Sequence, residues 1–288
     1  MRESVFQHLA GDSAQAGNIG KLLLDAGKLT TLQAEQTLAL QKQRGIRFGE
    51  AAVELGYVQP KDIAEILAVQ FDYPYLIRGK SALDDKLVAA YAPFSPAVEA
   101  LRSLRTQLML RWFSFGQKCV MFASYERDAG CSLTVANLAI VFSQLGERTL
   151  VIDGNLRTPH QHSLFGLPND SGLSDILAQR ADVGAIQKVT SLVGLHILSA
   201  GSSAPNPQEL LGRAHLGRLL DELQHEFDVV LIDTAPLQES SDAQLLAPPA
   251  QGVVMVLKKD STPTRSAEKL DAAMKLTKAE RLGFILTN

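Results

Sequence analysis

Short continuous apolar runs alternate with longer amphipathic stretches through the last two-thirds of the chain. The apolar runs predict strands at residues 119–124, 148–153, 195–199, 228–233, 253–258 and 283–287. The stretches between them place apolar residues at helical spacing and predict helices, for example at 132–145, 208–225 and 264–277. Continuous apolar strands flanked by helices are typical of a parallel sheet with both faces covered. This region therefore predicts an α/β fold built on a doubly wound parallel sheet.

The loop after the first of these strands has the spacing of a phosphate-binding P-loop. That pattern, G-x-x-x-x-G-K-[ST], joins a strand to a helix, which we expect to begin near Ser132. Gly130 and Ser132 match it, but Tyr125 replaces the first glycine and Cys131 replaces the lysine. The strand–loop–helix arrangement is kept, and the residue that binds the phosphates is not.

Two aspartates stand at the ends of apolar strands, Asp153 in VIDGNLRTP and Asp233 in VVLIDTAP. Ligands of open parallel sheets bind at the carboxyl ends of the strands. Ser132, Asp153 and Asp233 are therefore candidate ligands for Mg²⁺. The candidate nucleotide contacts lie in and beside the loop: Arg127, Gly130, Cys131, Ser132 and Leu133.

The N-terminal third is a tandem repeat, in which residues 18–41 and 47–70 align at an offset of twenty-nine positions. Each repeat predicts a helix, a glycine-led turn and a second helix. Gly27 and Gly56 are expected to end the first helix of each repeat in a left-handed cap. Two such repeats can bury their apolar faces against one another, so we expect a small α-helical tandem-repeat domain.

The repeats also carry groups that suit an anionic ligand. Gly20 and Gly49 leave the backbone uncovered near a helix N-terminus, where amides and the helix dipole favour anions. Nearby side chains can pair with phosphate, stack on a base or bind its edge: Arg44, Arg47, Gln41 and Gln70. Two nearly identical half-sites would suit a ligand that is itself two-fold.

These two motifs and their spacer, KQRGI, resemble the MshEN domain of type II secretion and pilus ATPases, over about residues 15–75. The resemblance implies that the domain binds cyclic di-GMP. Carried over by position, the contacts are Asn18, Ile19, Gly20, Gln41, Arg47, Phe48, Gly49 and Glu50. Asn18 stands where the family has arginine, and the loss of one charge-assisted contact costs about 1.5–3 kcal/mol. The alternative is a helical module that binds only protein.

A helix predicted from about residue 97 carries Glu99, Arg102 and Arg105 on one face. Such a triplet alone usually marks a solvated face. The E-x-x-R-x-x-R pattern resembles that of the bacterial tyrosine kinases of capsule and exopolysaccharide systems, where it builds a ring-shaped oligomer. The resemblance therefore implies a homo-oligomer formed through this helix.

From about residue 95 to Asn288 the chain resembles the P-loop domain of these kinases, the BY-kinases, and more narrowly their chain-length-determinant type. The family's G-K-S and A-N-L-A motifs correspond to residues 130–132 and 136–139. Its D-x-D-x-R-x-P motif appears at 153–159 with Asn155 as the second acidic position, and D-T-P-P appears as DTAP at 233–236. The family usually ends in a cluster of phosphorylated tyrosines, and no tyrosine follows Tyr125 here.

These departures predict an inactive relative whose degenerate catalytic positions are Cys131, Asp153, Asn155 and Asp233. Cysteine is short and mostly neutral at pH 7, and an asparagine carries no charge. ATP and Mg²⁺ remain candidate ligands, bound weakly through the loop amides or with Arg127 as a substitute cation. A catalytic thiol at Cys131 is disfavoured, because a nearby histidine is needed and His160 and His162 follow a different strand.

Composition changes this picture little. Hydrophobic residues make up 46% and charged residues 20% of the chain, as in folded proteins. A net charge of −3 gives no indication of a nucleic-acid partner. The two cysteines, Cys119 and Cys131, fit a reducing compartment, and no apolar run approaches the ~18 residues that cross a bilayer. We expect a cytoplasmic protein, peripheral at the inner membrane at most.

The sequence thus predicts an MshEN-like domain at 1–75, an exposed linker with a small helix at 76–95 and a degenerate BY-kinase-like domain at 96–288. The leading hypothesis is a cyclic di-GMP-responsive regulator or scaffold of bacterial exopolysaccharide biosynthesis and export. Its expected partner is an inner-membrane chain-length or export protein, or an active homologous kinase. The alternatives are an active ATP-dependent tyrosine autokinase or ATPase that controls polysaccharide chain length, and a scaffold that binds neither nucleotide.

Overall fold

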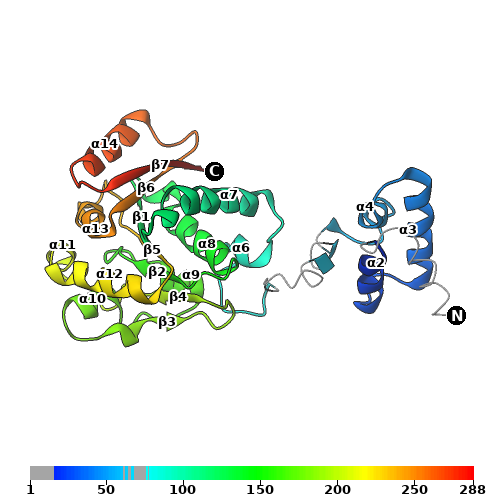
Figure 1. The fold of residues 1–288 in the computed structure, drawn as a ribbon, viewed down its shortest axis with the longest axis horizontal. Helices are drawn as coiled ribbons and strands as arrows, with labels where there is room; N and C mark the ends of the chain where they lie inside the picture. Colours follow the sequence, from blue (N-terminus) through cyan, green and yellow to red (C-terminus); the bar gives the residue numbers. More distant parts are fainter. Residues whose placement is uncertain (1–15, 61, 64–65, 68–75, 77) are drawn as a thin grey trace. The chain divides into compact units, whose positions relative to one another are not determined.

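The chain divides into two compact units, Met1–Pro74 and Tyr75–Asn288 (Figure 1). The computed structural model describes residues 16–60, 62–63, 66–67, 76 and 78–288. The first unit contains the helices α2 (Ala16–Asp25), α3 (Thr31–Arg44) and α4 (Phe48–Glu54). The second contains a seven-stranded sheet with helices on both faces.

The first unit repeats its backbone geometry as well as its sequence. Gly27 and Gly56 have φ of +68° and +70°, the left-handed conformation that glycine adopts without strain. In each repeat the residue after the glycine donates its N–H to the carbonyl oxygen five positions earlier, at 2.9 and 3.1 Å. The predicted left-handed caps are thereby confirmed. Leu23, Leu29 and Phe48 are buried in the small core that the repeats share.

The sheet of the second unit has the strand order β3-β4-β2-β5-β1-β6-β7. Its strands are β1 (Cys119–Ser124), β2 (Thr149–Asp153), β3 (Gln187–Lys188), β4 (Leu195–Leu198), β5 (Val229–Asp233), β6 (Gly252–Lys258) and β7 (Glu280–Thr287). All neighbours pair in parallel except β3, which is antiparallel to β4. The predicted α/β fold is confirmed. β3 was not predicted, because its two polar residues form no apolar run.

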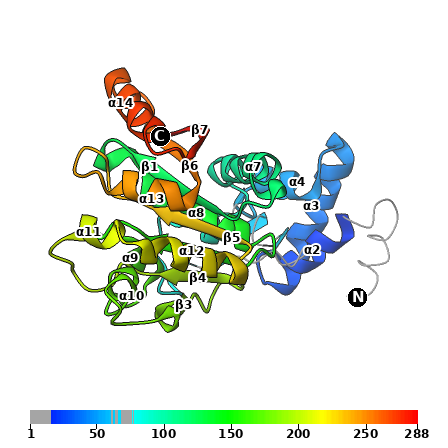
Figure 2. The same cartoon turned by 60° about the vertical axis from the view of Figure 1, so that its left-hand side comes forward.

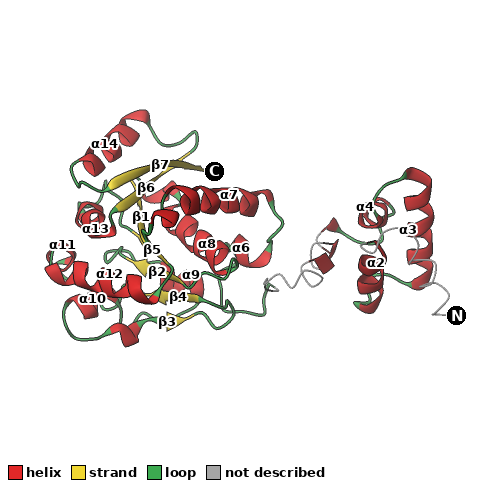
Figure 3. Ribbon diagram, in the orientation of Figure 1, coloured by secondary structure: helices red, strands yellow, loops and turns green. Residues whose placement is uncertain are grey.

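Helices cover both faces of this sheet (Figures 2 and 3). They are α6 (Val88–Tyr91), α7 (Pro96–Arg111), α8 (Cys131–Ser143), α9 (Gln161–Phe165), α10 (Leu173–Leu177), α11 (Pro207–Leu211), α12 (Ala214–Glu226), α13 (Asp242–Ala250) and α14 (Thr264–Lys275). Alternate residues of β1 enter separate cores: Phe122 packs with α7 and α8, and Met121 packs with α12, α13 and α14. The helix predicted at 208–225 is two helices, because the chain leaves helical geometry at Arg213.

The segment expected to be an exposed linker packs into the second unit. Leu83, Leu87 and Ala89 are buried in the core beneath α8. The backbone N–H of Ala89 also donates to Oδ1 of Asn137 on α8, at 2.9 Å. The prediction of an exposed connection is corrected here, because a run rich in polar residues conceals apolar side chains that face α8.

Among the helices of the described residues, none is long and apolar enough to cross a membrane.

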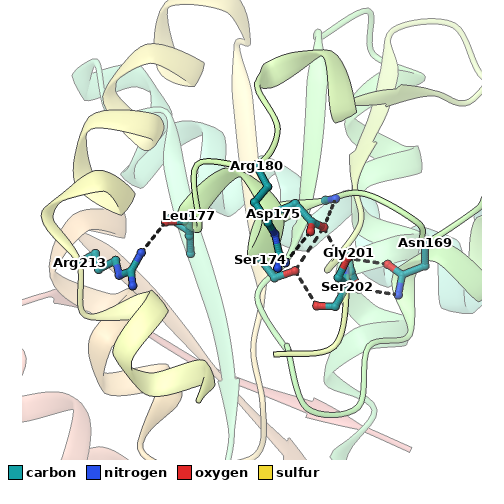
Figure 4. Close-up of polar contacts among 9 residues, drawn as sticks. Asn169, Ser174, Asp175, Leu177, Arg180, Gly201, Ser202 and Arg213 are labelled. Carbon is teal, nitrogen blue, oxygen red and sulfur yellow. Dashed lines mark hydrogen bonds and ion pairs between the residues drawn. The ribbon is translucent and has the colours of Figure 1, made fainter. Parts of the chain in front are cut away.

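A polar cluster around Asp175 fastens the loop before α10 to the loop after β4 (Figure 4). The Asp175 carboxylate accepts hydrogen bonds from the backbone N–H groups of Gly172 and Ser202, at 3.1 and 2.9 Å, and from Arg180 at 2.8 Å. Burial raises the pKa of Asp175, but the bonds from Ser202, Arg180 and Gly172 outweigh it and the net shift is downward. A Cβ atom at Gly172 would lie 2.1 Å from the carbonyl oxygen of Ser199, so the loops cross too closely for a side chain there.

Candidate functional site

The loop between β1 and α8 lies at the mouth of a cleft of about 630 Å³, at the carboxyl ends of the strands. Gly130 has φ of +75°, and its amide precedes the first turn of α8. The cleft is also lined by the loop after β2, by Thr234 and Pro236 after β5, and by Lys86 and Lys258. The strand–loop–helix arrangement of a P-loop is therefore present, and the amide end of a thirteen-residue helix faces the cleft.

Cys131, at the lysine position of the P-loop, is a buried and neutral thiol. Only 5% of the residue is exposed. Burial, and after it the charge of Asp233, raise the pKa of Cys131 well above its ordinary value. The side chain at this position therefore brings no positive charge to a phosphate, in agreement with the small size and low acidity of a thiol.

Asp153 and Asp233 are register partners on the adjacent strands β2 and β5, and both are fully buried. Burial and the charge of Asp233 raise the pKa of Asp153 to about 7, against the backbone N–H donors of Gln161, His160 and Asn155. Burial also raises the pKa of Asp233, although side-chain donors oppose the shift. Two neighbouring carboxylates thus share a buried site without a cation beside them among the described residues, and the charge of Asp233 favours the protonated form of Asp153.

Gln161, which the sequence analysis did not select, ties these groups together. Its Nε2 donates to Oδ2 of Asp233 at 2.8 Å and to the carbonyl oxygen of Ser132 at 3.0 Å. Its Oε1 is buried and has no hydrogen-bond partner in the part of the chain that the structure describes. A buried acceptor of this kind requires a donor, and a water bound to a metal ion would be one. A sequence carries no signal for it, because glutamine at the start of a short helix is ordinary.

The same observation tests whether Mg²⁺ fits. Gln161 is hydrogen-bonded to the carbonyl oxygen of Ser132 and to the carboxylates of Asp153 and Asp233, so Ser132 and the two carboxylates lie around the residue whose Oε1 is unsatisfied. Oxygen ligands are those that Mg²⁺ prefers, and it keeps several waters. The described residues contain no cluster of three or more His, Cys, Asp or Glu side chains that would hold a metal alone. The residues fit a magnesium ion that arrives with phosphate oxygens.

Arg127 lines the cleft but is already paired. Its Nε lies 2.7 Å from Oε1 of Glu239, and the Arg127 side chain is 59% exposed. Arg127 was predicted as a substitute for the missing lysine, but its charge is paired with that of Glu239. That pairing spans 112 positions in sequence and could not be inferred from the loop itself.

Two lysines that the sequence analysis did not select also line the cleft, Lys86 before α6 and Lys258 at the end of β6. Neither ammonium group has an ion-pair partner among the described residues. Their distance in sequence from the P-loop explains why no motif indicates them.

Asn155, at the second acidic position of its motif, closes a turn rather than facing a cation. It is 5% exposed; its Oδ1 accepts from the N–H of Thr158 at 3.0 Å, and its Nδ2 donates to Oγ1 of Thr158 at 3.1 Å. Both ends of the amide are thus used locally. Leu133, the last of the predicted nucleotide contacts, lines the cleft at half-buried depth.

The charged triplet of α7 makes contacts within the chain. Arg102 is paired with Glu99 at 3.0 Å, and NH1 of Arg105 donates to the carbonyl oxygen of Val141 on α8 at 2.8 Å. Glu99 is the most exposed of the three, with 69% of its side chain accessible. Assembly through this helix stays a prediction.

In the first unit, packing explains the two motif glycines. A Cβ atom at Gly20 would lie 3.2 Å from the ring of Phe48, and one at Gly49 would lie 3.3 Å from Ile63. Phe48 itself is 3% exposed and its side chain belongs to the core, so a ligand contact at this position stays a prediction. Close contact between helices therefore accounts for glycine at both positions.

The other residues of this unit that were predicted to contact a ligand differ in their pairing and exposure. Arg44 is paired with Glu54, and Oε2 of Glu50 accepts from the backbone N–H of Arg47 at 3.0 Å. The side chain of Arg47 is exposed. Ile19 and Gln41 are half-buried, whereas the Asn18 side chain and Gln70 lie outside the described residues.

Comparison with known proteins relates most of the chain to bacterial tyrosine kinases. No protein-family model matches the chain. It is 33% identical to the tyrosine-protein kinase YwqD of Bacillus subtilis over 206 residues, which are 72% of this chain and 87% of that protein. Its structure resembles the kinase domain of the Escherichia coli tyrosine kinase ETK, with a TM-score of 0.68, 28% identity, and 70% of this chain and 79% of that one covered.

A more distant likeness concerns the fold alone. The septum site-determining protein MinD of Pyrococcus horikoshii, in complex with Mg-ADP, matches with a TM-score of 0.50 and 21% identity. The match covers 59% of this chain and 70% of that one.

Proposed function

This chain belongs to the family of bacterial tyrosine kinases of exopolysaccharide systems, the BY-kinases, and from that premise we propose that it is a regulatory member that binds nucleotide without phosphorylating tyrosine. The observation that carries the proposal is the neutral thiol of Cys131, which is buried against Asp233 at the position of the P-loop lysine. Phosphoryl transfer in this class of site depends on positioning and on neutralising charge at the transferred group. A buried and neutral thiol cannot neutralise that charge.

Binding itself has support from groups that remain. The amides of the loop and of the first turn of α8 face the cleft, and backbone amides bind phosphates without a lysine. Ser132, Asp153 and Asp233 would hold Mg²⁺, which neutralises phosphate charge when bound. Gln161 positions Asp233 against the loop, and its free Oε1 would accept a hydrogen bond from water in the metal's shell. ETK and YwqD are tyrosine kinases, so the transfer of phosphate to tyrosine is the step to test in this chain.

A comparison of the wild type with Cys131→Lys tests this proposal. Isothermal titration with Mg-ATP measures binding, and anti-phosphotyrosine detection after incubation with Mg-ATP measures transfer. We expect the wild type to bind without forming phosphotyrosine. Cys131→Ser serves as the control for changes in the packing around Asp233. A wild-type protein that forms phosphotyrosine as fast as Cys131→Lys would overturn the proposal and favour the alternative, an active autokinase or ATPase that controls chain length.

A second candidate function is the binding of cyclic di-GMP by the first unit. Two features support it: the caps at Gly27 and Gly56 have the same backbone geometry in both repeats, as a two-fold ligand would require, and Arg47 is exposed beside the second motif. The packing of Gly20, Gly49 and Phe48 favours the alternative, a helical module that binds protein. Isothermal titration of cyclic di-GMP into the wild type and Arg47→Ala decides between them. Heat that Arg47→Ala abolishes supports the sensor, and no heat from the folded wild type rejects it.

Membership in this family also suggests the setting. We infer a role in exopolysaccharide biosynthesis or export beside an inner-membrane chain-length or export protein, or beside an active homologous kinase. Homo-oligomer formation through Glu99, Arg102 and Arg105 on α7 is part of the same proposal. Light scattering of the wild type and of a triple alanine variant tests it. A mass that is monomeric in both proteins would reject assembly through this helix.

A further inference from the structure

We propose that Lys86 supplies the cation that the P-loop lacks, so that the segment preceding α7 completes the phosphate site. This inference rests on the proposed function, since it assumes that the cleft binds nucleotide phosphate. Lys86 lines the same cleft as Gly130, Cys131 and Ser132. It lies forty-five positions before Cys131 and belongs to no P-loop motif.

The charges around the cleft require such a group. Asp153 and Asp233 are fully buried, Asp128 lines the cleft, and the nucleotide itself would add several negative charges. Arg127 is balanced by Glu239. Of the cations that line the cleft, Lys86 and Lys258 are the two without an ion pair in the described residues.

The backbone of Lys86 is fixed to the helix that begins at the P-loop. Its carbonyl oxygen accepts from Nδ2 of Asn137 on α8 at 3.3 Å, and that Nδ2 also donates to the carbonyl oxygen of Leu133 at 3.0 Å. Oδ1 of Asn137 accepts from the N–H of Ala89 at 2.9 Å. One buried amide thus joins the segment to the first turns of α8, so Lys86 is held in register with the loop.

A second anchor holds the segment from the other side. The N–H of Asp84 donates to the carbonyl oxygen of Leu164 on α9 at 2.9 Å, and Leu164 lines the cleft. Leu87 is fully buried immediately after Lys86. The Lys86 side chain is exposed between these anchors, so its backbone is positioned and its four-carbon stem is free to follow a phosphate.

Lys258 is the rival source of charge. It is the last residue of β6, a strand separated from β5 and β2 by β1, and it is half-buried. The Lys86 segment instead contacts α9, which follows β2, so the two lysines approach the loop from different sides of β1. Asp153 and Asp233, which would hold Mg²⁺ beside the phosphates, are on β2 and β5, and this favours Lys86.

The location of Lys86 has a consequence for regulation. The segment that carries it lies between the first unit and α7 in the sequence, and its docking depends on Asn137. An event that lifted residues 83–91 from α8 would withdraw the cation from the cleft without altering the P-loop.

The test is isothermal titration of Mg²⁺ with the non-hydrolysable analogue AMP-PNP into the full chain and its single variants. We expect Lys86→Ala to weaken binding by about 10- to 100-fold, the loss typical of one charge-assisted contact. Lys86→Arg keeps the charge and is expected to stay within a few-fold of the wild type. Lys80→Ala is the matched control, an exposed lysine of the same segment that does not line the cleft.

The outcomes separate this inference from the proposed function. Binding by the wild type that Lys86→Ala leaves unchanged, or that Lys258→Ala weakens instead, overturns the assignment of Lys86 and leaves the nucleotide site standing. A wild type that binds no AMP-PNP overturns both. Because the Lys86 side chain is exposed, the thermal unfolding curve of each variant should match that of the wild type without nucleotide, and a weakened Lys86→Ala that also unfolds early would count against a direct contact.

Discussion

In two regions of the second unit, the pKa values of buried aspartates are shifted in opposite directions. Asp175 is surrounded by donors from its own chain, two backbone N–H groups and Arg180, and its pKa is lowered. Asp153 and Asp233 are register partners on adjacent strands, with no such cation beside them in the part of the chain that the structure describes, and the pKa of each is raised. The first arrangement is complete as folded, and its role is to join two loops. In the second, the carboxylates have no compensating cation among the described residues. Uncompensated carboxylates at the carboxyl ends of parallel strands favour a ligand site over a structural one.

Removal of the Asp175 carboxylate should give the largest effect on stability. Asp175→Ala leaves two backbone donors and Arg180 without their acceptor, so we expect the free energy of unfolding to fall by about 2–4 kcal/mol. Urea unfolding followed by the fluorescence of Trp112, the only tryptophan and a buried residue of this unit, measures it. A loss below about 0.5 kcal/mol would mean that the cluster does not hold the loops together.

Asp153 should show the opposite dependence on pH. Its folded pKa is raised to about 7, so the folded state holds a proton that the unfolded state releases near pH 4. Its contribution to stability is therefore largest below that unfolded value and is lost as pH rises toward and through 7. Without nucleotide or metal, we expect the wild type to lose about 1–3 kcal/mol more than Asp153→Asn between pH 5 and pH 8.

The Asp175 site sharpens this comparison. Because the folded pKa of Asp175 is lowered, its contribution is present above the unfolded pKa and is lost as pH falls. The stability difference between wild type and Asp175→Asn should therefore shrink in acid, whereas the difference between wild type and Asp153→Asn changes at neutral pH. Identical pH profiles for the two asparagine variants would contradict the opposite pKa shifts of Asp175 and Asp153.

The smallest effect is expected for Arg180→Ala. The Arg180 side chain is 60% exposed, so its ion pair with Asp175 is screened by water. The backbone donors of Gly172 and Ser202 remain, and we expect a loss of less than about 1 kcal/mol in the same urea experiment. A loss equal to that of Asp175→Ala would assign the stability of the cluster to the arginine rather than to the amides.

The sequence was sufficient for the parts of this comparison that depend on local pattern. The apolar runs located β1, β2 and β5, and the strand ends placed Asp153 and Asp233 where the structure has them as register partners. The identity of residue 131 was also readable, and with it the absence of a lysine.

What sequence could not supply depends on tertiary contacts. Lys86 reaches the cleft because Asn137 binds a segment fifty-one positions away, and Arg127 is paired with a glutamate after β5. Gln161 matters through Asp233, seventy-two positions on. Gly20 and Gly49 were predicted to contact a ligand, because an uncovered backbone at a ligand site requires glycine. A close contact between helices also requires glycine, and this contact is visible only once Phe48 and Ile63 are placed.

The central claim is that a neutral thiol at the lysine position leaves a cleft that binds nucleotide but does not transfer its phosphate to tyrosine. Incubation of the full chain with Mg-ATP labelled in the γ-phosphate, followed by mass spectrometry for phosphotyrosine, tests it most directly. We predict no labelled tyrosine under conditions in which the wild type is saturated with nucleotide. Labelled tyrosine from the wild type that disappears in Asp233→Asn would contradict the account.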